Sequence, residues 1–213
     1  MRLVAGLLLL CLLSGCIGAP SREPSRGPAQ PPRVLDTAQL RQCLARLDAG
    51  VARYTLLPDR EFGGGCMAKG AVQLKDIGTR VAGLGAMTCP LANAFAVWVQ
   101  SDLTVPAMAE FNSPVVRIET FGTYACRNVN NAASGRLSEH AFANAVDVSA
   151  FVLGNGRRIS VLGGWSGDER ERRFLRSVRE GACRRFRTVL SPDYNALHRD
   201  HLHLDMGSGR ICS

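Results

Sequence analysis

The sequence has 213 residues, of which 46% are hydrophobic and 21% charged, with 22 Gly and 10 Pro; this composition indicates a globular chain and excludes a disordered or fibrous one. The longest apolar run, Leu3 to Leu13, is shorter than the ~20 residues that a helix needs to cross a bilayer, which excludes a multi-spanning membrane protein. The formal charge of +8 favours anionic partners, but the densest basic stretch, Asp168 to Arg187, alternates in sign as a solvated helix face does, so we expect no nucleic-acid partner.

The N-terminal residues have the pattern of a lipoprotein signal peptide, which we expect over residues 1–15. Met1 and Arg2 form a short positive region, an apolar stretch follows, and Leu13-Ser14-Gly15-Cys16 resembles the lipobox, whose cysteine is acylated before cleavage. A plain secretory signal is the alternative. Ile17 rather than Asp after the cysteine favours the outer membrane. We therefore expect a periplasmic protein that the lipid on Cys16 alone attaches to the membrane.

Residues 16–35 are predicted to form an extended tether. Five prolines lie among Ser, Gly, Ala and Arg in this segment. Such a composition cannot bury a core and favours polyproline II at ~3 Å per residue, which gives a reach of ~50 Å. We expect one globular domain, residues 36–213, that works at some distance from the membrane.

The first half of this domain has mainly helical patterns. We predict a first helix that Asp36 or Thr37 caps and that ends near the turn at residues 57–59, because apolar side chains recur at helical spacing. A glycine-rich loop at residues 63–65 then leads into a short strand around residues 72–74. Thr88 and Pro90 are typical of a helix start, and residues 91–100 are apolar enough for a buried helix that contains Trp98.

The second half has mainly strand patterns. Residues 115–120, 145–151 and 158–162 alternate as half-buried strands do, and residues 186–190 and 201–206 close the chain as two more. Between them, residues 167–180 form an amphipathic helix with Phe174, Leu175 and Val178 facing inward. This order predicts an α+β fold, in which helices pack on an antiparallel sheet that carries the functional site.

Six cysteines remain once Cys11 leaves with the signal peptide and Cys16 takes lipid: Cys43, Cys66, Cys89, Cys126, Cys183 and Cys212. An oxidising envelope permits three disulfides. Fifteen pairings are possible, and we predict the one between sequence neighbours, which joins Cys43 to Cys66, Cys89 to Cys126 and Cys183 to Cys212.

All four histidines lie in two short polar segments, one around His140 and one that holds His198, His201 and His203. On a strand, His201 and His203 project from the same face because they are two residues apart. Two imidazoles and a carboxylate from another strand are ligands that Zn²⁺ accepts, and catalytic zinc sites leave the fourth position to water. The sequence therefore predicts a zinc site.

Several short motifs are similar to those of one known family: Leu57-Pro58-Asp59, Cys89-Pro90-Leu91, Tyr124-Ala125-Cys126-Arg127, Ser138-Glu139-His140, Asn144-Ala145-Val146-Asp147, Ser191-Pro192-Asp193-Tyr194-Asn195 and Arg199-Asp200-His201-Leu202-His203-Leu204-Asp205. Over residues 40–212 the sequence resembles the extensin-like C-terminal domain proteins. These proteins belong to the clan of zinc peptidoglycan peptidases, which includes D,D-carboxypeptidases and the penicillin-insensitive murein endopeptidase.

The resemblance implies a ligand set. The clan's S-x-H-x-x-G-x-A-x-D pattern places the first two zinc ligands on His140 and Asp147, and its H-x-H pattern places the third on His203. Ala143 stands where the clan usually has glycine. Ser138 and His198 are expected to support the site, and Asp205 to orient a ligand histidine through its second ring nitrogen.

The resemblance also suggests catalytic residues. The H-x-x-H-x-H pattern of the murein endopeptidase favours His201 as general base or transition-state stabiliser. The carboxypeptidase branch has an acidic base three residues before the last ligand, where this chain has Asp200. Strand geometry turns Asp200 away from the face of His203, so we favour His201 and keep Asp200 as the alternative. Arg127 is the candidate for neutralising the oxyanion.

The sequence thus predicts a monomeric zinc peptidase that binds peptidoglycan and hydrolyses its peptide cross-links or stem peptides, at a bond between D-Ala and a diamino acid. Whether D,D or L,D bonds are cut stays open. The alternative is a non-catalytic, zinc-stabilised module that binds the cell wall or has a structural role. Trp98 is expected in the core, whereas Trp165 is a candidate for stacking on glycan as well as for the core.

Overall fold

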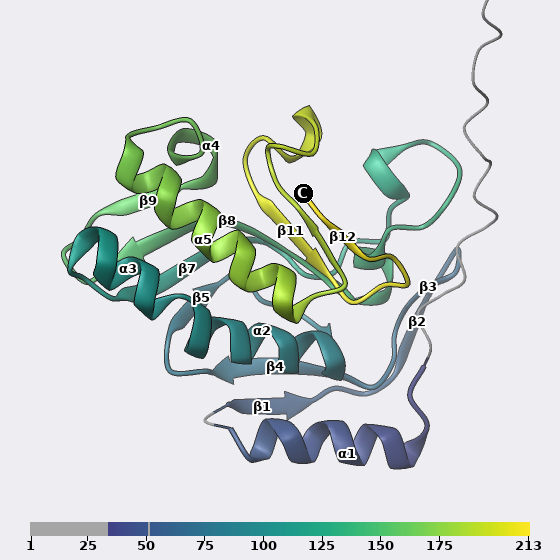
Figure 1. Cartoon of the computed structure of the whole chain (residues 1–213). Coiled ribbons are helices and arrows are strands. Elements are labelled where there is room, and N and C mark those ends of the chain that lie inside the picture. Colours follow the sequence, from purple (N-terminus) through teal and green to yellow (C-terminus); the bar gives the residue numbers. More distant parts are fainter. Residues whose placement is uncertain (1–33, 51) are drawn as a thin grey trace, which may run out of the picture.

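The computed structural model describes residues 34–50 and 52–213. The predicted signal peptide, the lipidation site at Cys16 and nearly all of the tether lie outside the described residues. Within them, the chain forms one α+β domain, as predicted (Figure 1). Among the described helices, none combines the length and apolar character needed to cross a membrane.

Helix α1 (Thr37–Asp48) begins at the predicted cap. The Asp36 carboxylate accepts hydrogen bonds from the amides of Ala38 and Gln39, and the Gln39 side chain accepts one from the Asp36 amide, which completes a capping box. The predicted end of this helix near residues 57–59 is wrong. The helix stops at Asp48, because residues 53–56 pair with another strand instead.

That pairing builds a small antiparallel sheet in the order β1-β4-β6, from β1 (Arg53–Leu56), β4 (Ala71–Asp76) and β6 (Met87–Thr88). Strands β2 (Arg60–Gly63) and β3 (Cys66–Ala68) form a separate hairpin whose turn contains the predicted glycine-rich loop. Figure 1 shows α1, β1 and β4 together at one end of the molecule.

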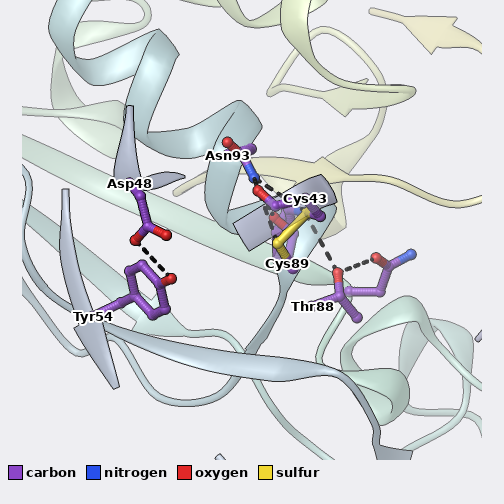
Figure 2. Close-up of a disulfide and its surroundings, with 8 residues drawn as sticks. Cys43, Asp48, Tyr54, Thr88, Cys89 and Asn93 are labelled. Carbon is purple, nitrogen blue, oxygen red and sulfur yellow. Dashed lines mark hydrogen bonds between the residues drawn. A yellow bond between two sulfur atoms is a disulfide. The ribbon is translucent and has the colours of Figure 1, made fainter. Parts of the chain in front are cut away.

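Helix α2 (Cys89–Asp102) starts as predicted, with the Thr88 hydroxyl accepting from the Leu91 amide. The Cys43–Cys89 disulfide ties α1 to this start, and the Asn93 side-chain amide donates to the Cys43 carbonyl beside it (Figure 2). A shorter helix, α3 (Thr104–Phe111), follows α2.

The main sheet has seven strands: β5 (Arg80–Ala82), β7 (Val115–Gly122), β8 (Ala145–Leu153), β9 (Arg158–Ser160), β10 (Thr188–Leu190), β11 (Leu202–Asp205) and β12 (Ile211–Cys212). Its centre, β10-β11-β8-β7, is antiparallel as predicted, whereas β5 and β12 pair in parallel at the two edges. Strand β8 is buried at almost every position rather than on one face only, and both α4 (Val161–Gly164) and the η2 segment (Glu139–Phe142) pack against it.

Helix α5 (Glu169–Arg185) covers one face of this sheet (Figure 1). Its Phe174, Leu175 and Val178 are buried as predicted. The strand predicted over residues 158–162 ends at Ser160, because the Ser160 hydroxyl caps the short helix α4 (Val161–Gly164). Two helices, α4 and α5, therefore lie between the strands β9 and β10 in the second half of the chain.

The core is centred on aromatic rings from three elements. The Trp98 ring of α2 and the Phe174 ring of α5 lie 6.1 Å and 5.4 Å from the Phe151 ring of β8. The Trp98 indole also donates to the Val178 carbonyl at 3.1 Å, so its predicted place in the core is confirmed. This packing fixes β8 from the helical side and leaves its other face to the functional site.

The disulfides are Cys43–Cys89, Cys66–Cys126 and Cys183–Cys212. Only the last agrees with the predicted pairing; the pairs Cys43–Cys66 and Cys89–Cys126 are wrong. Helix α1 packs beside the start of α2, and the β2–β3 hairpin packs beside the segment that follows β7. Spatial neighbours, not sequence neighbours, therefore set the pairing.

Candidate metal centre

Three buried side chains from different parts of the chain meet at one point: His140, Asp147 and His203. The His140 Nε2 atom lies 3.1 Å from Asp147 Oδ2 and 3.2 Å from His203 Nδ1. His203 Nδ1 lies 2.9 Å from Asp147 Oδ1. These are the three ligands that the sequence pattern predicted, and the group could hold a metal ion.

Strand register places two of the three. Asp147 and His203 are direct partners across β8 and β11. The neighbours Val146, Val148, Leu202 and Leu204 lie in the core. Because successive side chains of a strand point to opposite faces, Asp147 and His203 must project from the face that the core does not use.

His140 comes from a short 3₁₀ helix, η2 (Glu139–Phe142). The Ser138 hydroxyl accepts from the His140 amide at 3.3 Å, which places Ser138 next to the candidate ligand. Ala143 ends the helix in the left-handed conformation, with φ of 54°. The His140 Nδ1–H donates to the Thr123 carbonyl at 3.2 Å, which directs Nε2 toward Asp147 and His203.

Asp205 orients His203 through the second ring nitrogen, as predicted, because Nε2 lies 3.0 Å from Asp205 Oδ2. Burial works to lower the pKa of His203, but the hydrogen bonds to Asp147 and Asp205 outweigh it and raise the pKa to about 9. Burial likewise works to raise the pKa of Asp147, whereas hydrogen bonds from His140 and His203 hold that pKa well below its usual range.

His201 lies beside the three candidate ligands without joining them. Its Nε2 atom is 3.6 Å from Asp147 Oδ1, so His201 and His203 reach the same carboxylate, although β11 begins only at Leu202, after His201. The Nδ1–H of His201 donates to Asp200 Oδ1 at 2.9 Å. Asp200 thus uses its carboxylate to hold His201, and the His201 side chain stays 13% exposed.

Two side chains flank the His201 ring. The Phe121 ring, which is 62% exposed, lies 5.8 Å from it, and the His198 ring lies 5.2 Å from it. His198 Nδ1 donates to Asn195 Oδ1 at 2.7 Å, in the short helix η3 (Ala196–His198). Burial, together with the neighbouring His201, lowers the pKa of His198 to about 4, so this ring is neutral at pH 7.

Sequence reasoning assigned no role to Phe121, Thr123 or Asn195. Asn195 could have been found, because it stands three residues before His198, where an N-cap can reach a side chain in the following turn. Phe121 and Thr123 carry no such signal, because their contacts depend on the path of the chain after β7.

Arg127 is near the site, with Nη2 3.9 Å from Asp147 Oδ2 and a side chain that is 30% exposed. The Cys66–Cys126 disulfide fixes the backbone immediately before it.

Trp165 is only 5% exposed, its indole donates to Asp193, and the Arg176 guanidinium covers its ring. Of the two predicted roles, core packing and stacking on glycan, the burial of Trp165 therefore agrees with core packing.

A pocket of about 290 Å³ opens at the metal site. The side chains and backbone that line it include Arg127, Arg136, Glu139, His201, His203, Asp205 and Gly207. Burial raises the pKa of Glu139. The site thus combines three buried donors, a histidine with a directed Nε2 atom and a cavity that a substrate could enter.

Comparison with known families gives a match over most of the chain. The family model described as Extensin-like protein C-terminus matches residues 41–213, which is most of the chain. Comparison with curated proteins finds no match. The matched region contains every residue of the metal centre and all six disulfide cysteines, so the chain belongs to the extensin-like protein C-terminus family.

Proposed function

We propose that the protein is a zinc-dependent peptidase that hydrolyses peptide bonds of bacterial peptidoglycan. The observation that carries the proposal is the position of His201, whose Nε2 atom lies 3.6 Å from Asp147 while the three ligands are supplied by other residues. A purely structural metal site usually closes its coordination with a fourth protein ligand. A nearby histidine outside the ligand set instead favours proton transfer.

The donor set fits zinc. Two imidazoles and one carboxylate form a set of the kind found in catalytic zinc sites. The outer nitrogens of His140 and His203 are held by the Thr123 carbonyl and by Asp205, which is the support that zinc ligands normally receive. When bound there, zinc supplies Lewis acidity for a peptide carbonyl and for an attacking water.

The protein's own residues then move the proton and stabilise charge. With Nδ1–H held by Asp200, His201 directs the lone pair of Nε2 to the site and accepts the proton of the attacking water. Arg127 provides positive charge next to Asp147, where the oxyanion of the transition state develops. Asp200 in this scheme positions the base and does not replace it.

Peptidoglycan as the substrate is supported by the resemblance to zinc wall peptidases and by the disulfides. Disulfides form and persist in oxidising compartments such as the periplasm, where the wall is located. We propose a periplasmic monomer anchored to the outer membrane through lipid on Cys16, with a bond between D-Ala and a diamino acid as its target.

Digestion of purified sacculi by the zinc-loaded protein, followed by analysis of the released muropeptides, tests the proposal and identifies the bond. We expect new peptide ends, and no such products from the metal-free protein or from His201→Ala with full zinc content. Binding of sacculi without any cleavage by the wild type would overturn the proposal in favour of a non-catalytic wall-binding module.

A further inference from the structure

The end of the pocket that Arg136, Glu139 and Gly207 line has no role in the proposed hydrolysis. One wall there is formed by residues of the segment between β7 and β8, and the other by residues of the chain around β11 and β12. Figure 1 shows the course of both segments. Arg136 and Glu139 come from the first wall, and Gly207 comes from the second. This end therefore offers one cationic and one anionic side chain to the same space.

The Glu139 carboxylate is held in place from both sides. Its Oε2 atom accepts from the Asn144 side-chain amide at 2.7 Å, and Asn144 Oδ1 accepts from the Thr88 hydroxyl at 2.7 Å. On the other side, a Cβ on Gly207 would lie 2.7 Å from Glu139 Oε1, so a larger residue at this position would have to displace the carboxylate. A carboxylate fixed in this way is preorganised to bind a ligand.

Arg136 supplies the opposite charge without neutralising it. Its side chain is exposed, and its carbonyl accepts from the Val129 amide at 2.9 Å, which fixes the loop that carries it. The guanidinium is close enough for its charge to act on Glu139. Within the part of the chain that the structure describes, however, Arg136 forms no ion pair, so both groups are available to a ligand.

We propose that this end of the pocket binds an aminocarboxylate group, with the ammonium on Glu139 and the carboxylate on Arg136. Charge-assisted hydrogen bonds of this kind are stronger than neutral ones. The inference rests on the proposed function and names its substrate class. The matching group in a wall peptide is the side-chain end of a diamino dicarboxylic acid, provided that this end is not cross-linked, because cross-linking converts the ammonium to an amide.

The test uses three small probes and calorimetric titration of the zinc-loaded protein. Each probe is capped as an N-acetyl, C-methylamide derivative: diaminopimelic acid carries both charged groups on its side chain, lysine only the ammonium, and 2-aminopimelic acid only the carboxylate. None contains the proposed scissile bond, so binding is measured apart from hydrolysis. We expect the diaminopimelic probe to bind at least about tenfold more tightly than the other two.

Substitutions assign each charge. Arg136→Gln should remove the preference for diaminopimelic acid over lysine, and Glu139→Gln should remove the preference over 2-aminopimelic acid. Arg172→Gln, at an exposed position of α5 outside the pocket lining, is the matched control and should change no affinity. Zinc content shows whether each variant is folded around the metal site. If Glu139→Gln does not bind zinc, the probe affinities of Arg136→Gln alone decide the test.

Equal affinities for the three probes, no binding of any probe, or an unchanged preference in a folded Arg136→Gln variant would overturn the inference. Its failure is distinct from failure of the proposed function. If sacculi are cleaved but the three probes bind equally, the peptidase proposal stands and the subsite proposal is wrong. If the probes show the expected preferences but sacculi are not cleaved, the subsite proposal stands and the peptidase proposal is wrong.

Discussion

Asp147 and His203 face each other directly across β8 and β11, and Asp147 Oδ1 lies 2.9 Å from His203 Nδ1. Both residues are therefore positioned by the central strands of the main sheet, whose other face packs on the aromatic core. Only His140 comes from a less regular segment, and capping by Ser138 and the hydrogen bond to Thr123 hold it. Strand pairing and local hydrogen bonds thus hold all three candidate ligands.

The zinc content of variants should distinguish the three candidate zinc ligands from the histidines that lie beside them. We expect His140→Ala, Asp147→Asn and His203→Ala each to lose most of the bound zinc after dialysis against buffered metal, because three protein ligands are the minimum for a stable catalytic site. His198→Ala and His201→Ala should retain about one zinc per chain. Zinc is measured by atomic emission, and full occupancy of His203→Ala would contradict the ligand assignment.

Zinc uptake should release a proton below about pH 9. In the metal-free protein the His203 pKa is about 9, and both ring nitrogens donate to carboxylates, so the ring is protonated at pH 7. Zinc needs the lone pair on Nδ1, so the proton must leave and affinity should fall about tenfold per pH unit as pH decreases. Calorimetry in buffers of different ionisation enthalpy measures the released proton; a buffer-independent enthalpy at pH 7 would be inconsistent with it.

His201 and Asp200 should differ in their effect on hydrolysis. We expect His201→Ala to lower kcat by ~10²–10⁴, the usual contribution of a positioned general base. Asp200→Asn should cost only about ten- to a hundredfold, since it weakens the support of the His201 ring but keeps the base. Zinc content should stay unchanged in both. A larger loss from Asp200→Asn at full zinc occupancy would make Asp200 the base instead.

Arg127→Gln should lower kcat by about a hundredfold with a smaller change in KM, because its charge acts on the oxyanion that exists only in the transition state. Arg172→Gln, on the exposed surface of α5, serves as the control for loss of one positive charge. If Arg127→Gln instead raises KM alone, Arg127 binds substrate and does not stabilise the transition state.

Ala143 should be tolerant of glycine and intolerant of larger residues. Relief of a left-handed φ gains about 1 kcal/mol, and loss of one buried methyl group costs about as much, so Ala143→Gly should change the free energy of unfolding by less than about 1 kcal/mol. Ala143→Val adds a β-branched side chain to a buried left-handed position and should destabilise by more than about 2 kcal/mol. Urea denaturation measures both; a Val variant as stable as the wild type would show that the loop relaxes freely.

Local signals in the sequence were sufficient for the helix starts and for the histidine geometry. Asp36 and Thr88 cap their helices within three residues, so their effect does not depend on distant packing. The i, i+2 spacing of His201 and His203 likewise predicts a shared face whatever the neighbouring strands are. The three candidate ligands, in contrast, were implied by the resemblance to a known family and not by spacing alone.

Features set by distant contacts could not be predicted in this way. Strands β1 and β2 have mostly exposed residues with no alternation, and β1 forms only because β4 offers it a partner. The hydrogen bond from His201 to Asp200 depends on the path of the chain before β11, which spacing does not determine. The charges that Arg136 and Glu139 bring to one pocket depend on a loop closed by contacts between residues 127–129 and 136–138.

The disulfides between Cys43 and Cys89 and between Cys66 and Cys126 interleave along the chain, since each loop contains one cysteine of the other pair. A chain that oxidises its cysteines in order of synthesis joins Cys43 to Cys66 before Cys89 is available. Reaching the native pairs then requires attack of a free thiolate on that first bond. For a chain that oxidises in that order, the native pairs therefore require disulfide exchange, by an isomerase or a redox buffer, as well as burial of the core.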